Sequence, residues 1–503
     1  MTTSTFNLQL SQQQIFAQSA LKDLNPSLVW KWFSVICSIP HPSYADQALA
    51  DYIYEWGLSQ AHLEVAKDEI GNVLLRKQAS ANCHHYPTIC IQAHCDMVPQ
   101  AAAHKEHNFH TDPIVPRIIQ DNVYATDTTL GADNGIGLAC ALALLEDNSF
   151  EHGAIEVLCT RNEEVTMEGV IHLRDNWLQV SYLINTDTMQ WGQMNVGCAD
   201  GYDIDFTRKF PITKIEENDA IFLITVQGLR GGHSGLDIDK KHENALRILQ
   251  EVLSKLGEST PFKLISLSGG QARNAIIRQA QAYLSVDNPD EIKEVLEQII
   301  KQIKITYSHE TNLNFSLCQV STSGYTNALD YSNSLQALNF IACLPNGVLE
   351  YSSKYKAVKT SLSVGKFSLE DGEFKYQILL RSSEEDILSK TYEELKELSS
   401  QHDFTCQLMA NYACWSPQEN QLSQLAIKLY EQQEQQKLKL SVVHCGFECG
   451  YILQHYPQMQ LISLGPEISF AHSPQEHVVI DTVTKFYTLL QRIISQLHTL
   501  TPN

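Results

Sequence analysis

Short apolar runs alternate with longer segments of helical periodicity over residues 1–200. In the longer segments apolar residues recur every three or four positions, as on the buried face of a helix. The short runs have the length and composition of buried strands, and they are Asn72–Leu75, Thr88–Ile91, Ala154–Cys159 and Tyr182–Ile184. This alternation of strands and helices predicts an α/β domain.

The pattern changes after residue 200 and returns near residue 400. Polar and apolar residues alternate in Tyr202–Phe206, as in an antiparallel strand, and Glu243–Leu256 is amphipathic with a helical period. Similar strand and helix successions continue to the end of this part. We therefore predict an α/β fold in which one domain, residues 1–200 and 400–503, is interrupted by an inserted α+β domain, residues 201–399.

The composition narrows the class of protein. The chain has 503 residues, 43% of them hydrophobic, and its 36 Lys+Arg against 58 Asp+Glu give a net charge of −22. Such a charge repels phosphates, so we expect neither nucleic acid nor a membrane as a partner. No apolar stretch reaches the roughly 18 residues of a membrane span, and residues 1–25 lack the features of a signal peptide. Thirteen scattered cysteines indicate reduced thiols, so we expect a cytoplasmic location.

Potential metal ligands follow the predicted strands. His94 and Asp96 come directly after the strand-like run that begins at Thr88. Residues two apart on a strand point to the same side, so Asp96 could ligate a metal with His94 or accept its second N–H. By itself, a His-x-Asp pair is also compatible with an ordinary surface or core position.

Further ligand-type side chains lie at the ends of other apolar segments, and each has a simpler explanation when taken alone. Asp133 could cap the helix that follows its Gly-rich loop, and Glu163 with Glu164 could form an exposed charged loop. The Gly-rich loop lacks the spacing and the Lys of a phosphate-binding loop. Asp187 and His472 complete the set, each after a short apolar run and a turn or strand end.

Taken together, these positions favour a metal site. Two histidines and three carboxylates at strand or helix junctions match the location of active sites in α/β folds. Mixed imidazole and carboxylate ligation suits Zn²⁺, Co²⁺ or Mn²⁺ better than Mg²⁺ or Ca²⁺. Five ligands exceed the number expected for one catalytic zinc, so the sequence predicts two divalent ions, zinc in the first place, that share a carboxylate.

A series of motifs extends through the chain in a fixed order. It comprises HCDMV at 94–98, GADNGIG at 131–137, EE at 163–164, GLRGGHSG at 228–235, GGQARNAI at 269–276, HCGFECG at 444–450 and AHSP at 471–474. Together they resemble the M20 metallopeptidases, and most closely the aminoacyl-histidine (Xaa-His, carnosine-type) dipeptidase branch. The resemblance covers nearly the whole chain. Departures such as Asp127, where relatives usually have Gly, remove no expected ligand and bear on substrate preference.

The resemblance implies a metallo-exopeptidase, a dipeptidase that hydrolyses carnosine-like Xaa-His dipeptides. The interrupted domain would be catalytic and the inserted domain a lid. His94 and Glu164 would each serve a separate metal ion, Asp187 and His472 would complete the two ligand sets, and Asp133 would bridge the ions.

The same resemblance implies roles for residues that do not bind metal. Asp96 would orient the neighbouring histidine ligand, and Glu163 would be the general base. On the lid, His233 and Asn274 would close over the substrate, and Arg381 would bind the free carboxylate of a small peptide. In dimeric relatives the histidine that matches His233 helps to complete the partner's site, so a homodimer is compatible with this sequence.

Three alternatives stay open at this point. An aminotripeptidase or an N-acyl amino acid deacylase of the same superfamily would share every metal ligand. A two-metal phosphoester hydrolase could use similar ligands, although few cationic residues lie near the motifs. A non-catalytic binding protein descended from such an enzyme would bind no metal.

Overall fold

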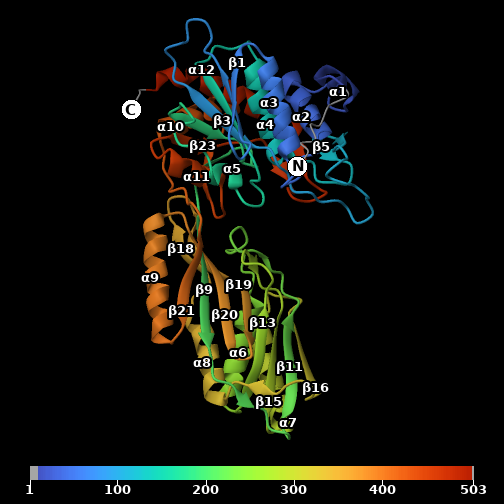
Figure 1. The fold of residues 1–503 in the computed structure, drawn as a ribbon, viewed down its shortest axis with the longest axis vertical. Coiled ribbons are helices and arrows are strands. Elements are labelled where there is room, and N and C mark those ends of the chain that lie inside the picture. The colour runs from blue at the N-terminus through green and yellow to red at the C-terminus, as the bar shows by residue number, and fades with distance from the viewer. Residues whose placement is uncertain (1–9, 501–503) are drawn as a thin grey trace. The chain divides into compact units, whose positions relative to one another are not determined.

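The computed structural model of the chain describes residues 10–500, which form two compact units (Figure 1). Within these residues, unit 1 comprises residues 10–197, Pro417–Ser441 and 447–500, and unit 2 comprises Cys198–Ser416 and Val442–Gly446. Residues 1–9 and 501–503, at the ends of the predicted interrupted domain, lie outside the described residues. The chain therefore leaves unit 1, builds most of unit 2 and returns.

Unit 1 is built on a mixed sheet whose central strands are parallel. Strands β6, β3, β7 and β23 run parallel, whereas β1 pairs antiparallel with β2, β2 with β6, and β8 with β23. The central strands are buried on both faces, as in a sheet covered by helices. The sheet order is β1 (Leu63–Lys67), β2 (Val73–Lys77), β6 (Ile155–Thr160), β3 (Ile89–His94), β7 (Tyr182–Asn185), β23 (Gln460–Ser463), β8 (Gln193–Cys198) and β22 (Lys439–Val443).

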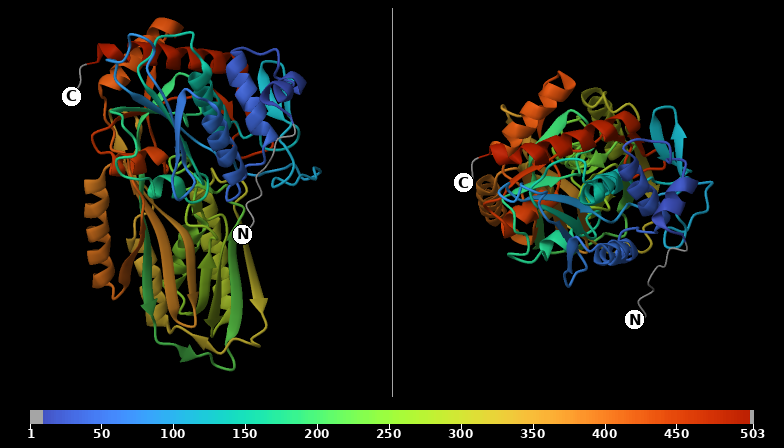
Figure 2. Two further views of the ribbon diagram at one scale, coloured as in Figure 1. Left: turned by 45° about the horizontal axis from the view of Figure 1, so that its top comes forward. Right: turned by 90° about the horizontal axis from the view of Figure 1, so that it is seen from above.

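Helix α4 is a buried helix of unit 1. Its sequence is apolar on all sides, and every residue from Ala132 to Leu145 is buried, because it packs between β3 and α2. Helices α10 and α12 pack against each other (Figure 2). The helices of unit 1 are α1 (Gln12–Gln18), α2 (Ser27–Ser38), α3 (Gln47–Ser59), α4 (Ala132–Glu146), α5 (Glu168–Ile171), α10 (Gln421–Glu434), α11 (Glu448–His455), α12 (Ile480–Gln496) and the 3₁₀ turn η1 (Leu497–Thr499).

A small antiparallel sheet completes unit 1. Its strands come from two distant parts of the chain and pair in the order β24 (Ile468–Ser469), β25 (His477–Val479), β5 (Asn122–Ala125) and β4 (Pro116–Ile119). This pairing fixes both ends of the loop at residues 470–476.

Unit 2 is an antiparallel sheet with helices packed on it. Alternate residues of β20, such as Phe374, Tyr376 and Ile378, are buried in a core that includes Phe206 and Phe340. The sheet order is β16 (Asn314–Val320), β11 (Ala220–Gln227), β15 (Ala280–Val286), β13 (Lys263–Gly269), β19 (Ala357–Glu370), β20 (Glu373–Ser382), β9 (Asp200–Lys209) and β21 (Thr405–Asn411), and β18 (Gly347–Ser352) also pairs with β19.

The helices of unit 2 follow amphipathic sequences. Helix α6 begins two residues later than the predicted Glu243–Leu256, because the side chain of Asn244 caps it by accepting the N–H of Leu246. Helix α9 packs along β9, β20 and β21 (Figure 1). The helices are α6 (Ala245–Gly257), α7 (Pro289–Thr306), α8 (Tyr331–Cys343) and α9 (Glu385–Gln401), and the two-residue strands are β10 (Thr213–Lys214), β17 (Asn327–Ala328), β12 (Gly232–His233) and β14 (Ala275–Ile276).

The predicted fold class, an α/β domain interrupted by an inserted α+β domain, is confirmed. Among the helices of residues 10–500, none combines the length and the apolar character needed to cross a membrane.

Candidate functional site

The parallel strands of unit 1 end together at one edge of the sheet. His94 at the end of β3 is in register with Thr160 at the end of β6, and Gln92 is in register with Asn185 of β7. Because the carboxyl ends of parallel strands share an edge, the segments that follow them meet there. The predicted site residues on or just after these strands are His94, Asp96, Glu163, Glu164 and Asp187.

The ring of His94 is held in one orientation. Its Nδ1 lies 3.0 Å from the backbone oxygen of Asp96, and its Nε2 lies 3.3 Å from Asp133 Oδ1 and 3.6 Å from Asp187 Oδ1. A backbone oxygen only accepts hydrogen bonds, so Nδ1 carries a proton. In the neutral ring the lone pair of Nε2 therefore points at two carboxylates, the orientation that a metal ligand requires.

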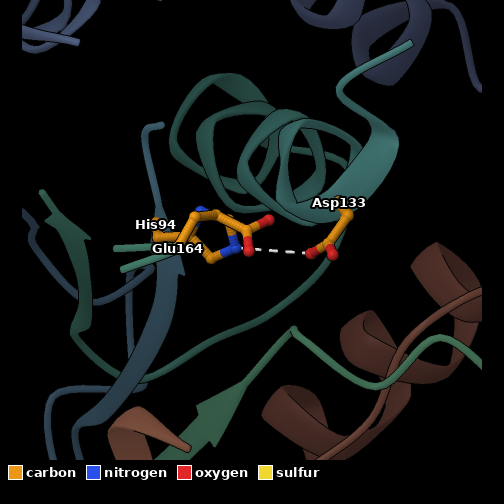
Figure 3. A group of neighbouring side chains, drawn as sticks. All are labelled: His94, Asp133 and Glu164. Atoms are coloured by element: carbon orange, nitrogen blue, oxygen red, sulfur yellow. Dashed lines mark hydrogen bonds and ion pairs between the residues drawn. The ribbon is translucent and has the colours of Figure 1, made fainter. Parts of the chain in front are cut away.

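Asp133 lies between two histidines. Its Oδ1 faces His94, and its Oδ2 lies 3.2 Å from Nε2 of His472, which is itself 2.8 Å from Glu164 Oε1. Figure 3 shows Asp133 at the start of α4 and His94 at the end of its strand, with their polar ends turned toward each other. The ligand atoms of His94, Asp133 and Glu164 all lie within 4.8 Å of one another, so these residues could hold a metal ion.

Asp96 holds the turn that carries the paired glutamates. Its Oδ1 accepts the backbone N–H of Glu163 at 2.9 Å, and its Oδ2 accepts that of Glu164 at 3.2 Å and the hydroxyl of Ser43 at 2.7 Å. The two glutamates consequently point to different partners. Glu164 reaches His472, whereas Glu163 Oε2 lies 4.0 Å from His94 Nε2.

The surroundings of Glu163, Glu164 and Asp187 disfavour a negative charge on these carboxylates. At Asp133 the two histidines outweigh burial and lower the pKa instead. Burial, reinforced by the charge of Asp133, raises the pKa of Asp187 well above its usual value. Burial also raises the pKa of Glu163, where Asp187 and Glu164 act in the same direction and His94 opposes them. Crowded carboxylates in a buried place require cations to offset them. The donor set, imidazole and carboxylate together, thus fits divalent metal ions.

The histidines respond to the same charge. Burial lowers the pKa of His94, but Asp133, Asp187 and Asp96 outweigh it, and the pKa lies well above its usual value. At His472 burial is likewise outweighed by Asp133 and Glu164, and the pKa rises to about 11. In the metal-free protein, protons on the imidazoles would supply the positive charge that metal ions supply when they bind.

A buried network behind the site was not predicted from the sequence. Glu448, which is completely buried at the start of α11, accepts a hydrogen bond from Gln92 Nε2 at 2.5 Å, and Asn185 Nδ2 donates to Gln92 Oε1 at 2.6 Å. Gln92 and Asn185 lie two residues before His94 and Asp187. Burial raises the pKa of Glu448 to about 7. Its place in the motif HCGFECG was the available signal.

The remaining predicted residues, His233, Asn274 and Arg381, belong to unit 2. His233 and Asn274 lie on neighbouring strand ends, since β12 pairs with β14 and the N–H of Ser234 donates to the backbone oxygen of Asn274 at 2.8 Å. Arg381, in β20, pairs in register with Ser361, whose hydroxyl lies 2.7 Å from Nε2 of His444.

The tautomer of His233 is determined by its own loop. The backbone N–H groups of Gly235 and Leu236 both donate to Nδ1, at 3.2 and 3.1 Å. Burial and, to a smaller extent, the charge of Arg381 lower the pKa of His233 to about 4, so the ring is neutral near pH 7. The proton must therefore be on Nε2, which makes this atom a hydrogen-bond donor.

His444 provides a test of the electrostatics of unit 2. Burial and, to a smaller extent, the charge of Arg381 lower its pKa to about 3. Below pH 6.5 the unfolded chain takes up a proton that the folded chain does not, so unfolding becomes more favourable as the pH falls from 6.5 toward 3. The free energy of unfolding falls by up to about 1.4 kcal/mol per pH unit because of this one group. We expect His444→Gln to lose less stability over this range than the unchanged protein in calorimetric scans, and a pH-independent difference would contradict the assignment.

The chain was compared with known proteins. The sequence model of "Peptidase family M20/M25/M40" matches residues 90–496. The cytosol non-specific dipeptidase of Escherichia coli (strain K12) is 36% identical over 488 residues, which cover 95% of this chain and 99% of that protein.

Solved structures extend this result. Aminoacylhistidine dipeptidase from Vibrio alginolyticus superposes with a TM-score of 0.84 at 34% identity, over 97% of this chain and 99% of that chain. An M20 family metallo-carboxypeptidase from Sulfolobus solfataricus, with a TM-score of 0.50 at 14% identity, covers 94% of this chain and 99% of its own and shows the shared fold alone.

Proposed function

Because the chain belongs to peptidase family M20/M25/M40, we propose that it is a metal-dependent dipeptidase that hydrolyses carnosine-like Xaa-His dipeptides. The observation that carries this proposal is the position of Asp133, whose two oxygens face two separate histidines. Two relatives that match nearly the whole chain support the substrate class, since one is named a non-specific dipeptidase and the other an aminoacylhistidine dipeptidase.

The residues of unit 1 would hold two divalent metal ions, and zinc is our first expectation, with cobalt and manganese as alternatives. His94 and Asp187 would form one ligand set, Glu164 and His472 the other, and Asp133 would belong to both. Bound metal ions polarise a carbonyl group and lower the pKa of an attacking water. Asp96 would keep the ring of His94 in the ligating orientation.

Glu163 would be the general base. It would take the proton of the attacking water and pass it to the amine nitrogen of the leaving residue. The hydrogen bonds from both glutamate N–H groups to Asp96 support this division of work, because they let Glu164 face His472 while Glu163 stays beside the site.

Unit 2 would act as a lid that supplies substrate contacts. The Nε2 proton of His233 is available to stabilise the oxyanion of the tetrahedral intermediate, and Asn274 would bind the substrate next to it. Arg381 would bind the terminal carboxylate through two parallel hydrogen bonds, which favours short peptides. In a homodimer, His233 could act on the partner subunit's substrate.

We further propose a cytoplasmic location and small peptides as the partners of this protein. The name of the Escherichia coli relative, a cytosol dipeptidase, supports both. We propose neither nucleic acid nor a membrane as a partner, in keeping with the net charge of −22.

Removal and restoration of metal tests the proposal. We expect a chelator to lower kcat/KM on Xaa-His dipeptides by at least about 10³-fold, because bound metal ions contribute several kcal/mol to catalysis. Zn²⁺, Co²⁺ or Mn²⁺ added singly should restore activity. The substrate panel should include β-alanyl and α-aminoacyl dipeptides, tripeptides, acylated amino acids and a phosphate ester.

Each outcome of the panel assigns the function. Faster turnover of tripeptides or acylated amino acids would identify an aminotripeptidase or a deacylase instead. Turnover of the phosphate ester alone would indicate a different reaction class. Absence of bound metal together with absence of hydrolysis would favour a binding protein.

A further inference from the structure

The start of α4 has no cap from its own sequence. The first N–H groups of a helix have no partner within the helix, and Ser, Thr, Asp or Asn at the N-cap usually accepts one of them. Here the N-cap is Gly131, which has a φ of +69° and no side chain to offer. Leu130 and Ala132 are buried, so water does not reach their N–H groups.

Asp133 and Asn134 have non-helical φ/ψ, so residues 130–134 form an irregular turn ahead of the regular part of α4. Glu476 holds this turn from a distant part of the chain. Its Oε2 accepts the N–H groups of Leu130 and Gly131 at 2.8 and 3.0 Å. Its Oε1 accepts those of Ala132 and Asp133 at 2.8 and 3.2 Å. The residue is 2% exposed. A carboxylate suits this place, because each of its two oxygens accepts two of these N–H groups.

The same side chain connects two parts of the candidate metal centre. Glu476 lies four residues after His472, in the loop between β24 and β25, and its own N–H donates to the backbone oxygen of Ser473 at 3.0 Å. Asp133 is 343 positions away in the sequence. Glu476 thus ties the turn that carries Asp133 to the loop that carries His472.

The two proposed ligand sets differ in how firmly the fold holds them. His94 and Asp187 lie at the ends of buried parallel strands, whose register fixes them. His472 lies in a loop, and its side chain is 48% exposed. The position of His472 relative to Asp133 therefore depends strongly on Glu476. The position of His94 relative to Asp133 depends on it less, because the strand register holds His94.

We propose that Glu476 is a positioning residue of the metal centre, which sets the geometry of the ligand set formed by Glu164, His472 and the shared Asp133. The inference rests on the proposed function, because it requires two metal ions. It predicts that loss of Glu476 selectively lowers the affinity for one of the two ions. Loss of a purely structural residue would change the affinity for both ions equally or for neither.

Glu476→Gln tests the proposal, since the amide keeps the size of the side chain but its nitrogen cannot accept the helix N–H groups. Metal-free protein should be titrated with Zn²⁺ in a calorimeter. We expect one ion to bind about 10- to 100-fold more weakly, the usual effect of losing a partner that supports ligands, and the other to change less than about threefold. In the metal-free variant, the amides of residues 130–133 should also exchange hydrogen faster. Saturating metal should restore most of the turnover.

Glu156→Gln is the matched control. Glu156 is equally buried in unit 1 and accepts a hydrogen bond from Arg76 Nε at 2.8 Å, but it lies near the other end of β6 from the metal centre. The Glu156→Gln variant should have a lower thermal stability and the same affinity for both zinc ions as the wild-type protein. If Glu476→Gln does not fold, Glu476→Asp keeps the charge on a shorter side chain and should weaken the same ion to a smaller extent.

The failures of the two proposals are distinguishable. Equal weakening of both ions, or unchanged affinities, in the folded Glu476 variants would overturn the positioning role and leave the metallopeptidase proposal intact. If the wild-type protein binds fewer than two zinc ions, the two-metal centre itself is wrong, and so is the role of Glu476.

Discussion

Glu163→Gln is expected to lower kcat for an Xaa-His dipeptide by about 10²–10⁴-fold while both metal ions stay bound, and Glu163→Ala should behave alike. A general base contributes this much when it is positioned to take the proton of the nucleophile. The amide of Gln has nearly the same shape as the carboxylate but cannot take up the proton. The measurement is steady-state kinetics together with metal content by elemental analysis. Near-normal turnover would remove Glu163 from the role of base.

The neighbouring glutamate is the natural control for this variant. Glu164 lies in the same turn, and its backbone N–H also donates to Asp96. Its carboxylate, however, lies 2.8 Å from Nε2 of His472. Glu164→Gln should therefore lose bound metal as well as activity. The pair separates a proton acceptor from a ligand at adjacent positions, and equal metal loss in both variants would contradict the division proposed for them.

Asp133→Ala is expected to lower the affinity for both metal ions and to reduce kcat/KM by at least about 10³-fold. The reason is that one carboxylate serves both ligand sets, with Oδ1 facing His94 and Oδ2 facing His472. Metal ions contribute several kcal/mol to a hydrolysis of this kind, and each 1.36 kcal/mol corresponds to tenfold in rate. Zinc titration of the metal-free variant, followed by kinetics at saturating zinc, measures both effects.

Asp147→Asn provides the comparison at the other end of the same helix. Asp147 follows the last residue of α4 and accepts hydrogen bonds from Tyr487 at 2.9 Å and Gln491 at 2.8 Å. We expect this variant to change thermal stability but neither zinc affinity nor kcat/KM. Retention of both ions by Asp133→Ala would show that Asp133 is not shared between them.

The fold class was predictable because local periodicity reflects burial. Continuous apolar runs marked the central parallel strands, and alternation such as that of Tyr202–Phe206 marked the antiparallel sheet of unit 2. The boundaries predicted near residues 200 and 400 stay a proposal for the functional domains. Unit 2 also takes in Val442–Gly446, which no local pattern indicated.

The candidate ligands were predictable for a related reason. Parallel strands direct their carboxyl ends to one edge, so acids and histidines placed just after apolar runs have a good chance of meeting there. His94, Asp133, Glu164, Asp187 and His472 do lie within one group in unit 1. Their roles as ligands stay a prediction until metal binding is measured.

The sequence by itself therefore determined the kinds of secondary structure, the fold class, the family resemblance and the chemical identity of the candidate site. Only the tertiary structure decided which oxygen of Asp133 faces which histidine, and that Glu448 and Glu476 form hydrogen bonds with the segments that carry the candidate ligands. Apart from the contact between Asp133 and His94, these contacts join residues more than 300 positions apart. Their distances depend on how strands and loops pack together, and neither periodicity nor spacing along the chain records such distances.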